Sequence, residues 1–244
     1  MVNRYWILTA DRVLKSFGDQ TETFTPLHPK RPVSISSTRL RDGCLVLYED
    51  GYVESFGTAP LLGDLTAFQL EAPPRDIEIS PTGTGYWVID ERGSVFSFGG
   101  APFLEGVPQV SAGQIDASSV RSTPNGDGYW IISRIGEIFC FGTATFHGAI
   151  QELEDSRSLE IIQFFAKSDL SEYTLLSSDG TFVRFKDPST QPTKYKTQID
   201  DIVGAVEMSQ GLLLISRSGA VISHDGAPNL GSTVLSNSPV IAVC

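Results

Sequence analysis

The chain has 244 residues, of which 41% are hydrophobic and 10% aromatic, and its net charge is −11. This hydrophobic content suffices for a packed core, and apolar runs of only five or six residues are too short for a membrane-spanning helix. The acidic balance argues against binding to nucleic-acid phosphates, which requires clustered lysines and arginines.

Six β-hairpins are predicted along the chain, because pairs of aromatic and β-branched runs are joined by short turns. The third hairpin is the clearest. Its first run is Tyr86 to Asp90, its turn contains Gly93, and its second run stops at Gly99. The six hairpins lie near residues 4–18, 43–57, 85–99, 128–142, 172–186 and 211–225.

The hairpins are copies of one repeat. Each copy has an anchor position near its end, and successive anchors are 39 to 44 residues apart: Phe17, Phe56, Phe98, Phe141, Phe185 and His224. Eleven residues before these anchors stand Trp6, Leu45, Trp87, Trp130, Thr174 and Leu213. A period near 40 residues with three or four strands per unit is typical of a β-propeller.

The two ends of the sequence indicate how the ring closes. A short apolar run precedes every hairpin except the first, and the run that is left over stands at residues 240–244. We therefore predict an all-β fold, a single six-bladed β-propeller of about 40 residues per blade that spans residues 1–244 as one domain. The C-terminal strand, residues 240–244, is expected to complete the first blade.

The repeated aromatic residues are predicted to be core residues. The residues concerned are Trp6, Trp87, Trp130, Phe17, Phe56, Phe98, Phe141 and Phe185. The pairs Tyr5-Trp6, Tyr86-Trp87 and Tyr129-Trp130 could instead form a set of sugar-stacking rings, but their period and their strand positions favour filling of the space between blades. The three cysteines are too scattered for a disulfide framework and are also interpreted as small core residues.

Residues 85–103 and 128–146 share the pattern Gly-Tyr-Trp, a turn glycine, Phe-x-Phe-Gly and a final Ala-x-Phe. This pattern resembles a propeller repeat of bacterial proteins, notably secreted or wall-associated actinobacterial ones. More loosely, it is similar to the regulator-of-chromosome-condensation and tectonin propellers. The resemblance implies a fold, and it implies no catalytic residues.

Known catalytic and metal-binding motifs are missing from the sequence. There is no His-x-x-x-His, no Cys-x-x-Cys, no Gly-x-Ser-x-Gly and no phosphate-binding glycine loop. We therefore predict a protein that is not an enzyme, with no catalytic residues, cofactor or metal. Arginines recur in the hairpin turns, at Arg92, Arg134 and Arg217, and could form a binding surface on one rim, although a solvated ring of turn residues is the preferred interpretation.

The leading functional prediction is a non-catalytic interaction module that binds other proteins of a larger assembly. A virion tail or adhesion component of a bacteriophage, or a cell-surface complex, would fit. Alternatives are a lectin-like propeller that binds glycans, and a hydrolase or lyase that uses the central channel. No signal peptide is visible at the N-terminus, so we expect synthesis in the cytoplasm and action in a virion or at the cell exterior.

Overall fold

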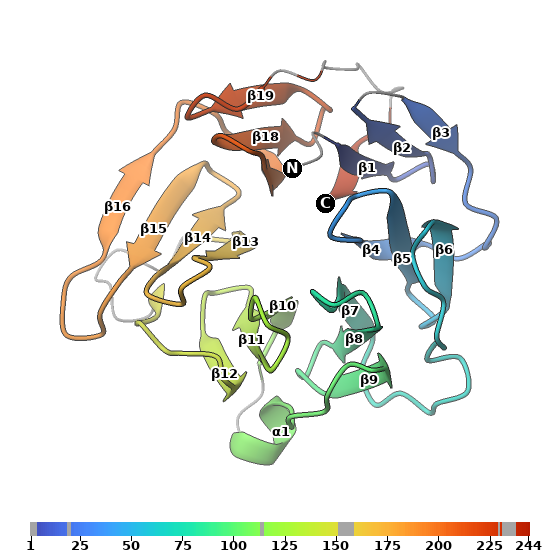
Figure 1. The fold of residues 1–244 in the computed structure, drawn as a ribbon, viewed down its shortest axis with the longest axis horizontal. Helices are drawn as coiled ribbons and strands as arrows, with labels where there is room; N and C mark the ends of the chain where they lie inside the picture. Colours follow the sequence, from blue (N-terminus) through green and yellow to red (C-terminus); the bar gives the residue numbers. More distant parts are fainter. Residues whose placement is uncertain (1–3, 19–20, 113–114, 151–158, 229, 231–237) are drawn as a thin grey trace.

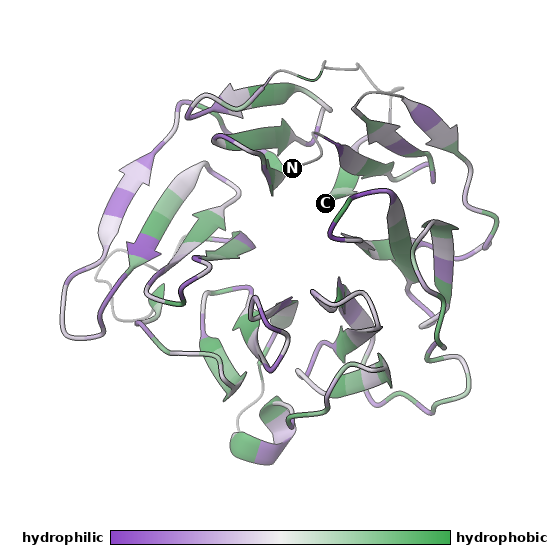
Figure 2. Ribbon diagram, in the orientation of Figure 1, coloured by the Kyte–Doolittle hydropathy of each residue, from purple (hydrophilic) through white to green (hydrophobic). Residues whose placement is uncertain are grey.

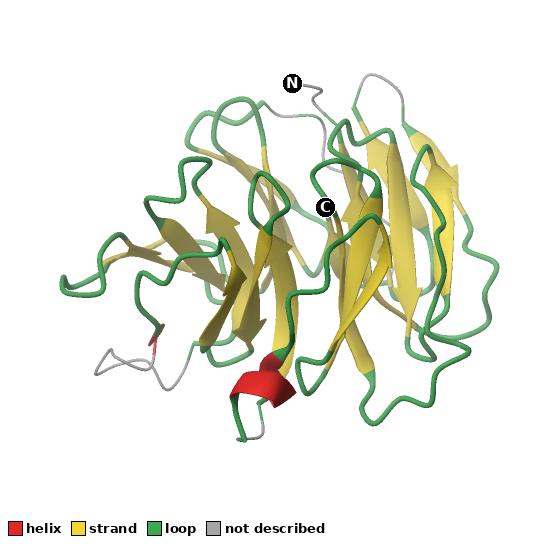
Figure 3. Ribbon diagram, turned by 60° about the horizontal axis from the view of Figure 1, so that its bottom comes forward, coloured by secondary structure: helices red, strands yellow, loops and turns green. Residues whose placement is uncertain are grey.

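The computed structural model describes residues 4–18, 21–112, 115–150, 159–228, 230 and 238–244. Within these residues, antiparallel strands form six sheets that are arranged radially around a central axis (Figure 1). The prediction of a six-bladed all-β propeller is confirmed. Figure 3 shows the strands spanning the molecule, with loops at both of their ends.

Each blade is one sheet, and we number the blades 1 to 6 in chain order. From the axis outward, blade 1 consists of β20 (Val240–Val243), β1 (Tyr5–Thr9), β2 (Leu14–Phe17) and β3 (Glu22–Phe24). Blade 2 consists of β4 (Pro32–Ser37), β5 (Gly43–Tyr48) and β6 (Val53–Gly57). Blade 3 consists of β7 (Pro74–Ile79), β8 (Gly85–Asp90) and β9 (Val95–Gly99). Blade 4 consists of β10 (Ala117–Ser122), β11 (Gly128–Ser133) and β12 (Ile138–Gly142). Blade 5 consists of β13 (Ile161–Ala166), β14 (Tyr173–Ser177), β15 (Thr181–Phe185) and β16 (Thr193–Lys196). Blade 6 consists of β17 (Ile202–Glu207), β18 (Leu212–Ser216) and β19 (Val221–His224). One short helix, α1 (Val107–Val110), follows blade 3.

The ring closes through the C-terminal strand, as the sequence predicts. Strand β20 pairs with β1, with Val243 opposite Ile7 and Ala242 opposite Leu8. Trp6 and Cys244 exchange two backbone hydrogen bonds of 2.7 and 3.1 Å. The two ends of the chain therefore lie side by side in blade 1 (Figure 1).

Apolar side chains fill the wedge between each pair of neighbouring blades. Between blades 3 and 4, Trp87 packs edge-on against Tyr129, with ring centroids 5.6 Å apart. Between blades 4 and 5, Trp130 packs in the same way against Tyr173. Of the repeat aromatics, Phe56 and Phe98 are half-buried and the others are buried: Trp6, Trp87, Trp130, Phe17, Phe141 and Phe185. In Figure 2 the apolar residues accordingly concentrate in the strands of the blades, and the loops are more polar.

A second repeated contact involves the tyrosine beside the tryptophan. The Tyr129 hydroxyl donates to the Glu105 carbonyl at 2.5 Å and accepts from the Leu104 amide at 3.0 Å. Tyr86 and Tyr173 make the same pair of bonds to the chain that leaves the preceding blade. The tails that leave blades 2, 3 and 4 are therefore each hydrogen-bonded to the following blade.

The hairpin turns require a left-handed backbone. The five turn glycines have φ between 75° and 86°: Gly51, Gly93, Gly136, Gly180 and Gly219. At Gly93, an added Cβ would lie 2.7 Å from the Val107 side chain, so close packing excludes a larger residue as well. Arg12 takes the position of the glycine in the first hairpin and adopts φ 63°. Among the described residues, no helix is long and apolar enough to cross a membrane.

Candidate functional site

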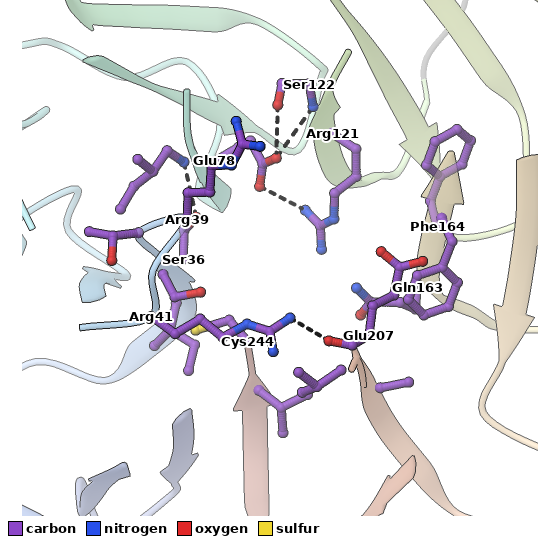
Figure 4. A pocket seen from close by; sticks show the side chains of 18 of the residues that line it. Ser36, Arg39, Arg41, Glu78, Arg121, Ser122, Gln163, Phe164, Glu207 and Cys244 are labelled. Atoms are coloured by element: carbon purple, nitrogen blue, oxygen red, sulfur yellow. Dashed lines mark hydrogen bonds and ion pairs between the residues drawn. The ribbon is translucent and has the colours of Figure 1, made fainter. Parts of the chain in front are cut away.

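A polar cavity of about 330 Å³ lies on the axis, at the end of the channel where the innermost strands finish (Figure 4). The innermost strands of all six blades run in the same direction, so their last residues meet at this end, which we call the channel mouth. The residues at or just after these strand ends are Ser37, Ile79, Ser122, Ala166, Glu207 and Cys244. The loop after β4 adds Arg39 and Arg41 to the lining.

The wall of the cavity contains an ion pair between two blades. The Nη1 atom of Arg121 in β10 lies 2.6 Å from the Asp76 carboxylate in β7. The Asp76 carboxylate also accepts a hydrogen bond from the Val120 amide, at 3.0 Å, and one from the Ser34 hydroxyl of blade 2. Because Asp76 is only 5% exposed, these partners replace the water that its charge would otherwise require.

Glu78 is the second acidic group of this wall. Its carboxylate accepts hydrogen bonds from the Ser122 amide at 3.4 Å and the Ser122 hydroxyl at 3.2 Å, and it lies 3.9 Å from Arg121. Burial raises the pKa of Glu78, and the nearby Arg121 charge opposes that shift. Between blades 2 and 3, the Ser36 hydroxyl accepts a hydrogen bond from the Ile79 amide at 2.9 Å. A neutral hydroxyl there makes the contact that the Glu78 carboxylate makes with the Ser122 amide between blades 3 and 4.

Cationic groups surround the open side of the cavity. Arg41 donates to the backbone carbonyls of Glu207 at 2.6 Å and Arg4 at 3.1 Å, and burial lowers its pKa. Arg39 is exposed and forms no ion pair with the residues that the structure describes. The protein atoms around the Glu207 carboxyl group partly desolvate it, which raises its pKa, and the Arg41 charge opposes that shift. The mouth therefore presents both charge signs within one small concave surface.

This arrangement offers hydrogen-bond donors and acceptors and charges of both signs. Within the described parts of the chain, no group of three or more His, Cys, Asp and Glu side chains could hold a metal ion. Asp76 and Glu78 are engaged by neighbouring donors, which fixes their positions. The chemistry that the mouth can supply is recognition of polar and charged groups.

The arginines singled out in the sequence lie away from this cavity. The three turn arginines come just after the second strands of blades 3, 4 and 6: Arg92, Arg134 and Arg217. The last residues of these second strands pair with the first residues of the innermost strands β7, β10 and β17. They are thus at the end of the blades opposite the channel mouth. Each is paired with an acidic group near its own turn: Glu71 for Arg92, Asp116 and Glu160 for Arg134, and Asp201 for Arg217.

The charged residues of the cavity were not identified in the sequence. Asp76 and Glu78 alternate with Ile77 and Ile79 in a run that was interpreted only as an inner strand. Arg121 stands in the corresponding run of the next blade, at the same register position as Glu78. Glu78 and Arg121, two charged residues at the same position of successive innermost strands, were the sequence feature that could have indicated a polar site at the axis.

Comparison with known proteins supports the fold and nothing finer. No family model matches the sequence, and no curated protein does. A chain in a crystal structure of a nidogen/laminin complex superposes with a TM-score of 0.69, covering 99% of this chain and 97% of that chain at 7% identity. Since 1171 chains in solved structures match, the similarity defines the propeller architecture without selecting a function.

Proposed function

We propose that this propeller is a non-catalytic binding module that joins a larger protein assembly through its channel mouth. The observation that carries the proposal is the ring of charged side chains contributed by several blades to one concave surface. The inner charges of Asp76, Glu78 and Arg121 are already held by hydrogen bonds. A partner would therefore meet an ordered surface, and little conformational freedom would be lost on binding.

Two features of the mouth suit a protein partner. Arg39 and Glu207 are exposed charges of opposite sign, which favours a partner with polar and charged side chains over an apolar one. In addition, the propeller matched by the comparison belongs to a protein–protein complex. We extend that role to this chain as part of the proposal.

The finer proposal concerns the kind of assembly. The repeat resembles that of bacterial surface-associated proteins, which supports a virion tail or adhesion component, or a cell-surface complex. Such a component would be made in the cytoplasm and act in a virion or at the cell exterior.

The channel mouth can be tested against the opposite end of the blades. Tagged wild type, Arg39→Glu and Arg92→Glu are incubated with lysate from the native source, and captured proteins are quantified by mass spectrometry. Both arginines are exposed, and because both variants replace arginine with glutamate, they change the net charge equally. We expect Arg39→Glu to reduce capture of the native partner about tenfold and Arg92→Glu to leave it unchanged. Loss of capture with Arg92→Glu alone would place docking at the turn arginines and contradict the proposal.

A further inference from the structure

One wedge of the propeller differs from the other five. Every wedge receives one side chain from the tryptophan position of one blade and one from the tyrosine position of the next. The pairs are Trp6 with Cys44, Leu45 with Tyr86, Trp87 with Tyr129, Trp130 with Tyr173, Leu213 with Tyr5, and Thr174 with Leu212. Only the last pair, between blades 5 and 6, contains no aromatic ring.

The missing rings leave a groove of about 520 Å³ between blades 5 and 6. It adjoins the channel mouth, because Arg41, Phe165 and Glu207 line both spaces. In three other wedges a tail of chain is hydrogen-bonded to the tyrosine hydroxyl of the next blade, at Tyr86, Tyr129 and Tyr173. Here the tyrosine is replaced by Leu212, and the chain after β15 forms the outer strand β16 instead.

Arg184 provides the unusual charge in this groove. It stands directly opposite Thr174 in the pairing of β14 with β15, so both side chains face the same wedge as Phe182. In the other five blades this position holds a small residue: Ser16, Ser55, Ser97, Cys140 and Ser223. Arg184 is half-buried, yet its guanidinium makes no hydrogen bond or ion pair with any residue that the structure describes.

An aromatic wall and two carboxylates complete the groove. Tyr195 of β16 lies flat against Phe182, with centroids 4.8 Å apart and planes 6° apart. Tyr195, Asp225 and Arg184 all line the groove. Burial and the Asp225 carboxylate raise the pKa of Tyr195, and the Arg184 charge opposes that shift. Asp225 and Glu207 are exposed and can accept hydrogen bonds.

We propose that the groove between blades 5 and 6 binds an acidic sugar, a monosaccharide unit that carries a carboxylate. A guanidinium without a partner is suited to hold a carboxylate through two parallel hydrogen bonds. The hydroxyl groups of a sugar can donate to Asp225 and Glu207, while its ring lies against Tyr195. A purely apolar ligand would bury these charges without partners, which is costly. This site adjoins the protein-docking surface proposed above, shares Arg41, Phe165 and Glu207 with it, and goes beyond it in taking a small ligand.

The test measures binding of small probes by isothermal titration and saturation-transfer NMR. The probes are glucuronate, N-acetylneuraminate, neutral glucose and indole-3-acetate. The variants are Arg184→Ser, which restores the residue of most blades, Thr174→Trp, which restores the wedge tryptophan, and Arg92→Ser as a control at the opposite end. Thermal melting verifies that each variant is folded.

We expect at least one acidic sugar to bind the wild type and glucose to bind at least about tenfold more weakly, because a charge-assisted bidentate contact is lost. Arg184→Ser should weaken binding by a similar factor, Thr174→Trp should abolish it, and Arg92→Ser should not change it. The proposal is overturned if neither acidic sugar binds, if glucose binds equally well, or if Arg184→Ser binds like the wild type. Preferential binding of indole-3-acetate would assign the groove to aromatic acids and would overturn it as well. None of these outcomes bears on docking at the channel mouth, which is tested through Arg39.

Discussion

The carboxylate of Asp76 and the guanidinium of Arg121 lie 2.6 Å apart and connect blades 3 and 4 beside the central axis. The same carboxylate accepts the Ser34 hydroxyl of blade 2, so one side chain links three consecutive blades. A buried charge with several fixed donors is costly to disturb, because its removal leaves those donors without acceptors.

We therefore predict that Asp76→Ala lowers the free energy of unfolding by about 3–5 kcal/mol, since it removes the 2.6 Å ion pair of Arg121, leaves only the 3.9 Å contact with Glu78, and takes the acceptor from the Ser34 hydroxyl and the Val120 amide. Urea denaturation at neutral pH measures the change. Arg217→Ala serves as the matched control, because it removes one exposed ion pair with Asp201, and such pairs contribute about 1 kcal/mol or less. Equal costs for the two variants would contradict the structural role of Asp76.

Glu78 should make stability depend on pH in a defined direction. Burial raises its pKa above the ordinary value of 4.5 in the folded state. The folded protein thus binds this proton more tightly than the unfolded chain, and the resulting stabilisation is complete below pH 4.5 and lost as the pH rises through the folded-state pKa. Glu78→Gln should remove this component, so its stability relative to the wild type should increase from pH 4 towards pH 7. Parallel pH profiles of wild type and variant would count against this assignment.

The tyrosine hydroxyls that fasten neighbouring blades should contribute measurably to stability. Tyr129→Phe removes the contacts to the Glu105 carbonyl and the Leu104 amide, at an expected cost of about 1–3 kcal/mol. Tyr52→Phe is the control, because the Tyr52 hydroxyl makes no hydrogen bond within the described residues, and its ring stacking on His28 would be kept. Chemical denaturation of both variants gives the comparison, and an equally large effect of Tyr52→Phe would speak against the inter-blade role.

Two glycines with similar backbone angles allow the cost of backbone strain to be measured separately from the cost of side-chain overpacking. Gly83 and Gly93 have φ of 71° and 75°. A Cβ at Gly83 would meet nothing within 4 Å, whereas one at Gly93 would approach the Val107 side chain to 2.7 Å. Gly83→Ala should therefore cost about 1 kcal/mol from backbone strain alone, and Gly93→Ala about 1–3 kcal/mol more from overpacking. Melting curves of the two variants that coincide would show that the contact with Val107 is relieved without cost.

The fold could be predicted from the sequence because most wedges need large apolar side chains at the same two positions. Those positions, occupied by Trp87 and Tyr129 in one wedge, recur once per blade, so their period reveals the number of blades. The unmatched run at residues 240–244 revealed closure for the same reason, since β1 lacked an inner neighbour. Packing repeats leave a direct trace in the sequence.

The cavity and the groove leave a weaker trace. Asp76 and Arg121 are far apart in the chain, and their pairing depends on how the blades are placed around the axis. Thr174 stands at a position held by tryptophan or leucine in the other copies, but only the structure shows that Arg184 faces the space it leaves. The turn arginine Arg92 was chosen because arginines recur in the turns, and its acidic partner Glu71 comes from another part of the chain.

The central claim, that this propeller is a binding component of a larger assembly, is tested most directly by the native mass of the protein. Material from the source is fractionated by size under native conditions, and each fraction is analysed by mass spectrometry. We predict elution in a particle of fixed stoichiometry, well above the 26.5 kDa of the free chain. Elution only at the mass of the free chain would contradict the account.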